Sequence, residues 1–150
     1  MICEVRALSP SDIENWDNEP ARDPNDSVSL EKAWHGLHYL LTGSVGNGEG
    51  DLGFLLAGGA NLGADRGYGP ARVFSPPIVQ RLNAALVAVS DHDLWGRFDP
   101  QLMEAQGIYP VIWDEDEAEL KAEYLEYFHD LKTLVAKASA EGKAISVVIS

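Results

Sequence analysis

The sequence predicts an α+β fold, in which a small, mostly antiparallel or mixed sheet packs against several helices, including a long C-terminal helix. Strand patterns stand at both ends of the chain, in "MICEVRAL" and in the β-branched "AISVVIS". Helical periodicity is strongest between Asp114, where acidic residues favour a helix start, and Gly142. The strand and helix patterns do not alternate regularly, which favours α+β over a parallel α/β sheet. Neither a repeat nor a linker interrupts the 150 residues, so we expect one domain over residues 1–150.

The N-terminal strand leads into a short helix in "SPSDIENW", where Ser9 is the expected N-cap and Pro10 the first helical residue. The next segment, "DNEPARDPNDS", predicts a loop because it is dense in Pro, Asp and Asn. A second helix is expected between its cap Ser29 and its stop at Gly43. Its apolar positions have helical three- and four-residue spacing: Leu30, Ala33, Trp34, Leu37 and Leu41.

The middle of the chain alternates glycine-rich connections with short ordered segments. "GSVGNGEGDLG" predicts a loop, "FLLAGG" a buried strand, "ANLGADRGYGP" a second connection and "ARVF" another strand. "SPPIVQRLNAALVAVS" predicts a helix opened by Ser-Pro, and "SDHDLWGRFDPQLMEAQG" two short helical turns with acidic caps. "IYPVIW" is expected to be extended. The long helix then buries Leu120, Tyr124, Tyr127, Leu131, Leu134 and Ala138.

The charge of the chain limits its expected partners. Eleven Lys and Arg against 24 Asp and Glu give a formal net charge of −13. Nucleic acid and membrane surfaces are therefore not expected as partners, whereas a small molecule or a basic protein suits the acidity, which also serves solubility. The N-terminus lacks a signal-peptide pattern, which predicts a cytoplasmic protein, and the single Cys3 lies in an apolar stretch typical of a buried, inert thiol.

The candidate site with the clearest chemistry lies in "KAWHGLHYLLTG". At about 100° per residue, a polar flank borders the apolar face of the expected helix, and we call it the histidine stripe. It consists of Glu31, His35, His38 and Thr42. Two imidazoles and a carboxylate can bind a metal or exchange protons, but a boundary His38 bonded to a carbonyl, a solvated His35 and a Glu31 in the first turn explain the pattern more simply. With no further ligand identifiable, we predict no metal site.

Two aromatic turns provide further candidates. "RGYGPAR" can bind a carboxylate or phosphate through Arg66 or Arg72 beneath Tyr68, or form a structural turn. "GIYPVIWDEDE" combines Tyr109 and Trp113 with Asp114 and its acidic neighbours, which a rigid turn and a helix start also explain. "GEGDLG" matches G-x-G-x-x-G, but the expected order is helix, loop, strand, the reverse of a dinucleotide site.

Three stretches together resemble the YfbM-like family of small bacterial proteins of unknown function: "KAWHGLHYLLTG", "GYGPARVFSP" and "FDPQLMEAQGIYPVIWDEDE". The likeness covers nearly the whole chain in the same order. It implies a single YfbM-like domain of α+β fold in a cytosolic bacterial protein, and it brings no activity, cofactor or catalytic residue with it. The chain departs from the family between Ile13 and Val28, where relatives typically have a longer helical segment.

These observations support three hypotheses. The first is a non-enzymatic module that binds a small molecule or a protein. The second is a hydrolase or metal-dependent enzyme that uses His35 and His38 with Glu31 and Asp114, which requires both imidazoles to face one cleft. The third is an acidic inhibitor or immunity-type protein that covers a basic site. The candidate binding residues are Trp34, His35, His38, Tyr68, Arg72, Tyr109, Trp113 and Asp114; catalytic residues and cofactors stay unassigned.

Overall fold

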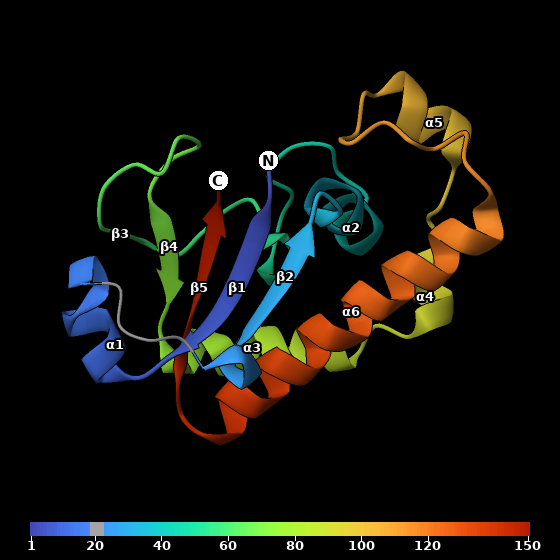
Figure 1. Ribbon diagram of the computed structural model, residues 1–150. Helices are drawn as coiled ribbons and strands as arrows, with labels where there is room; N and C mark the ends of the chain where they lie inside the picture. Colours follow the sequence, from blue (N-terminus) through green and yellow to red (C-terminus); the bar gives the residue numbers. More distant parts are fainter. Residues whose placement is uncertain (19–22) are drawn as a thin grey trace.

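The computed structural model describes residues 1–18 and 23–150, and within them a five-stranded antiparallel sheet forms the centre of the fold (Figure 1). The strand order is β2-β1-β5-β4-β3, so the two strands from the ends of the chain pair at the centre. The strands are β1 (Cys3–Leu8), β2 (Ser27–Glu31), β3 (Ala60–Leu62), β4 (Ala71–Phe74) and β5 (Ala144–Ile149). The predicted α+β class and the strands at both ends of the chain are confirmed.

The predicted long C-terminal helix is also confirmed, as α6 (Glu117–Ala140). It begins after Asp116, whose side chain accepts a hydrogen bond from the main chain of Glu119 and thus caps the first turn. Its buried face contains Phe128, whereas Tyr127 is only partly buried. The other α-helices are α1 (Pro10–Glu14), α2 (Trp34–Thr42), α3 (Pro76–Val87), α4 (Asp91–Trp95) and α5 (Pro100–Ala105).

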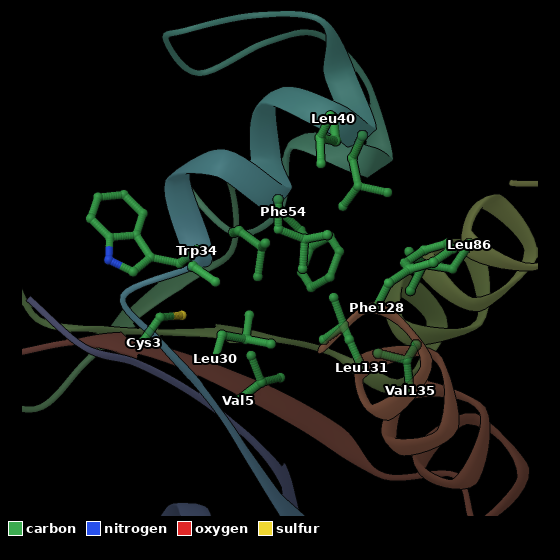
Figure 2. Packing of buried hydrophobic residues seen from close by; sticks show 14 of the residues in the cluster. Cys3, Val5, Leu30, Trp34, Leu40, Phe54, Leu86, Phe128, Leu131 and Val135 are labelled. Atoms are coloured by element: carbon green, nitrogen blue, oxygen red, sulfur yellow. The ribbon is translucent and has the colours of Figure 1, made fainter. Parts of the chain in front are cut away.

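The main core lies between one face of the sheet and helices α2, α3 and α6. Figure 2 shows Cys3, Val5 and Leu30 from the strands directed toward the side chains of these helices. Burial of this kind is the main favourable term in folding and fixes the helices on the sheet. Cys3 is fully buried, as expected, and burial raises the pKa of its thiol to about 12. A second, smaller cluster consists of Leu8, Trp16, Ala71 and Ala144.

Residues 27–31 were expected at a loop end and a helix start, and this prediction is wrong. They form the edge strand β2, which pairs antiparallel with Cys3–Arg6. The helix begins at Trp34, so Ser29 is not its N-cap and Glu31 lies outside it. Leu30 is buried in the strand just as it would be in a helix, so the apolar spacing did not distinguish the two. The pairing with β1, distant in sequence, decides the conformation.

Three other expectations about the middle of the chain are corrected. "FLLAGG" is buried at Phe54 and Leu55 but forms turns, while residues 60–62, expected in a connection, form β3. "IYPVIW" is not a strand but consists of turns and irregular segments, with Val111 at a φ of 62°. The two short turns are α4 and α5, but Ser90 rather than an acidic residue caps α4. The predicted loop after α1 lies partly outside the described residues.

Candidate functional site

His35 uses both of its ring nitrogens in hydrogen bonds to the main chain. The N–H of Tyr109 donates to Nδ1 over 3.0 Å, so Nε2 carries the proton and donates to the carbonyl of Val45 over 2.8 Å. The ring also stacks on Trp34 with a centroid distance of 5.4 Å. His35 is therefore not simply solvated: it joins α2 to the loop after it and to the segment around Tyr109.

His38 is fully buried and forms a second anchor for the same loop. Its Nε2 lies 2.5 Å from the carbonyl oxygen of Gly46, as in the structural interpretation of the sequence. Burial lowers the pKa of His38, which favours the uncharged ring. Thr42 continues the stripe by donating from its hydroxyl to the carbonyl of His38 over 2.8 Å. A fully buried His38 is not open to a cleft, whereas the metal or hydrolase hypothesis requires both imidazoles to face one.

Arg72 is held by the turn that replaces the expected strand at residues 54–59. Its guanidinium donates to the carbonyls of Phe54, Leu55 and Gly58, at 3.0, 2.5 and 3.2 Å. Those carbonyls have no strand partner, so Arg72 satisfies groups that would otherwise be unpaired. Tyr68 is 60% exposed on the loop before β4. Arg72 thus has a structural role in this turn.

The predicted aromatic residues belong mainly to the core. Trp113 is 1% exposed and donates from its indole to the carbonyl of Ile108 over 2.8 Å. Trp34 is also buried, and its ring lies 5.7 Å from that of the half-buried Tyr109. Asp114 is exposed at the approach to α6. Of the eight predicted residues, Trp34, His35 and Tyr109 contact one another.

A groove forms beside these residues, where the end of β2, the 110–115 segment and α6 meet. Its volume is about 540 Å³, within the range of small-molecule sites. Three glutamates from these three segments and one lysine give it an acidic lining, and we call it the acidic groove. It is lined by Glu31, Lys32, Ala33, Pro110, Ile112, Glu115, Glu123, Tyr124 and Tyr127.

Burial and the neighbouring glutamates both act on the two tyrosines of the acidic groove. Burial, followed by the charges of Glu123 and Glu31, raises the pKa of Tyr127. Burial also raises the pKa of Tyr124, and the charges of Glu123 and Glu115 add to this increase. The Tyr124 hydroxyl is buried and has no hydrogen-bond partner in the described part of the chain. Carboxylates around a groove of this size suit an organic cation, which gains charge pairing with them.

The carboxylates are not arranged for a bare metal ion. Among residues 1–18 and 23–150, no three His, Cys, Asp or Glu side chains are grouped closely enough to bind one. The glutamates of the acidic groove are spread around its walls instead, which suits a ligand with several atoms.

Two strained residues border the acidic groove. Glu31 has φ 46° and Val111, between Pro110 and Ile112, has φ 62°, in the left-handed region that costs a residue with a side chain about 1–3 kcal/mol. Such strain persists only where the surrounding contacts enforce it and is frequent at binding sites. The backbone of the groove rim is therefore held in a fixed shape.

Several residues of the acidic groove were singled out in the sequence, but as parts of other features. Glu31 was assigned to the histidine stripe, Glu115 to the acidic helix start, and the tyrosines to a core face. Glu123 was missed, although its four-residue spacing from Tyr127 places both on one side of a helix. The spacing within α6 was visible in the sequence, but Glu31 to Ala33, which complete the groove, are distant from it in sequence.

A family model for a domain of unknown function, DUF1877, matches residues 1–148. The chain belongs to the DUF1877 family. Its structure is similar to that of YfbM from Escherichia coli, described as a protein of unknown function, with a TM-score of 0.77, 18% sequence identity and full coverage of both chains. The resemblance to the YfbM-like family is thus confirmed, and the two proteins share a fold.

The other comparisons add no activity to the DUF1877 assignment. No curated protein matches the chain. In the described part of this DUF1877 chain, none of the helices combines the length and apolar character needed to cross a bilayer.

Proposed function

We propose that this protein is a non-enzymatic, cytoplasmic bacterial binding module that accepts a cationic ligand in the acidic groove. The observation that carries the proposal is the convergence of Glu31, Glu115 and Glu123 from three segments around a cavity of about 540 Å³. The net charge of −13 adds a long-range attraction for cations. The ligand is a small organic cation or a basic group of a partner protein.

The geometry favours this proposal over an enzyme that uses the histidine stripe. His35 binds main-chain groups through both nitrogens, and His38 is buried against Gly46. A general base needs a nitrogen that can reach its substrate. In the acidic groove, by contrast, the three glutamate side chains lie at exposed positions and are accessible to a ligand.

Isothermal titration calorimetry with arginine amide and spermidine at low salt tests the proposal. Replacing both Glu31 and Glu123 by Gln removes two charge interactions of about 1 kcal/mol each, so affinity is expected to fall about tenfold or more. Glu14→Gln is the matched control, because Glu14 is exposed at the end of α1, outside the acidic groove.

The wild type and the control are expected to bind alike. If the cations bind all three proteins equally, or bind none of them, the acidic groove is not the site. Glutamate amide, which shares the amide but carries a carboxylate, is expected not to bind.

A further inference from the structure

We infer that the partner of the acidic groove is an extended basic peptide segment that adds to the sheet as a strand beside β2. This inference rests on the proposed function and specifies its ligand. Three features of the molecule carry it: an edge of β2 that pairs with no further strand among residues 1–18 and 23–150, a second groove along that edge, and the uneven distribution of charge between the two grooves.

The orientation of this edge of β2 follows from the pairing of the central strands. Ile2 and Ser150 exchange both main-chain hydrogen bonds, at 2.8 and 2.9 Å. In an antiparallel ladder, pairs that exchange main-chain hydrogen bonds alternate with pairs that do not. The N–H and C=O groups of even-numbered residues of β1 therefore point toward β5, and those of odd-numbered residues point toward β2. Val28 stands opposite Val5 and bonds to β1, so Ser27 and Ser29 direct their N–H and C=O groups outward.

A second groove of about 380 Å³ follows this edge, and we call it the edge groove. Ser27, Val28 and Ser29 form its β2 side, and Asp130, Thr133 and Leu134 of α6 are opposite. Figure 1 shows β2 at the end of the sheet with α6 running beside it. A groove between an edge strand and a helix can hold an extended chain, with main-chain bonds to the strand and side chains against the helix.

The edge groove and the acidic groove follow one another along the same junction. Glu123, Tyr127, Asp130 and Leu134 line them in turn, and their spacings of four, three and four residues place them in one row on α6. On the strand side, the lining residues run from Ser27 to Glu31 in the opposite direction. The two grooves thus form one track about as long as β2.

The charge along this track orients its occupant. The acidic end carries Glu31, Glu115 and Glu123 against the single Lys32. At the other end Asp130 lies with Lys137, which also pairs with Asp26 at 3.2 Å. Antiparallel pairing is the more stable arrangement, and a strand antiparallel to β2 begins beside Glu31. Its N-terminal residues therefore carry the Lys or Arg side chains that enter the acidic groove.

The test uses a library of short peptides in which valines alternate with randomised positions. Lysine or arginine is fixed near the N-terminal end of every peptide. Binders are expected, and reversing their sequence is expected to weaken binding about tenfold, because the basic residues then face the wrong end. N-methylation of the alternate residues that bond to Ser27 and Ser29 is expected to weaken binding by a similar factor, about tenfold, since main-chain bonds are lost. Methylation at the intervening residues is expected to leave binding unchanged.

The outcomes separate this inference from the proposed function. If arginine amide binds but no peptide of the library does, or if methylation has the same effect at every position, strand addition is overturned and the cation site survives. If neither arginine amide nor any peptide binds, the proposed function fails and this inference fails with it.

Discussion

Gly36→Ala tests the packing that places α2 against the wall of the acidic groove. A Cβ atom at Gly36 would lie 2.4 Å from Cη2 of Trp113 and 2.8 Å from the hydroxyl of Tyr124. Both rings are 1% exposed, so neither is a flexible surface group that can move aside. Overpacking of this kind costs about 1–3 kcal/mol, and these contacts place the cost at the upper end.

The helix itself favours the substitution, because Ala is better than Gly in a helix by about 1 kcal/mol. The expected result is a net loss of about 2 kcal/mol in the free energy of unfolding, measured by urea denaturation. Gly46→Ala is the matched control: its Cβ has no neighbour within 4 Å and its φ is not positive, so no loss is expected. A Gly36→Ala protein as stable as the wild type would refute the close approach of α2 to Trp113 and Tyr124.

Three further predictions concern single residues. Burial lowers the pKa of His38 from 6.5, so the unfolded chain binds the proton first; His38 contributes its full stability above pH 6.5 and loses it below. Urea titrations should therefore show a steeper loss of stability on acidification for the wild type than for His38→Gln, and equal slopes would contradict a buried, uncharged imidazole. Arg72→Lys is expected to destabilise by about 2 kcal/mol, because an ammonium cannot reproduce the forked donation to three carbonyls; denaturation within experimental error of the wild type would be inconsistent with that role. Val111→Gly should stabilise the protein by about 1 kcal/mol by relieving its positive φ, and a drop in melting temperature would show that the strain is not there.

Local signals predicted much of this fold. Strands β1 and β5, helix α3 after Ser-Pro and the long helix α6 follow from periodicity and capping in their own segments. The wrong predictions fall where residues that are distant in sequence determine the local conformation. Leu30 is buried equally well in a helix or a strand, and only the pairing of residues 27–31 with β1 selects the strand. Likewise, the apolar run at Phe54 forms turns, and Arg72, eighteen residues on, donates to its carbonyl.

The difference between local and distant contacts also explains which parts of the candidate site were predicted. The histidines and tryptophans were candidates because of their residue types, but most of them are buried in the core or hydrogen-bonded to the main chain. The acidic groove depends on Glu31, which is distant in sequence from Glu115 and Glu123, and all three are common residues on an acidic chain. Its position requires the strand β2, which the periodicity did not reveal, because Glu31 reaches the groove only from the end of that strand.

The most direct test of the central claim is a two-dimensional ¹H–¹⁵N NMR titration of the protein with arginine amide. We expect chemical-shift changes at Glu31, Lys32, Glu115, Glu123 and Tyr127, which are lost when Glu31 and Glu123 are both replaced by Gln. Shifts centred on His35, His38 and the loop after α2, or shifts that persist in the double variant, would instead place the binding site at the histidine stripe.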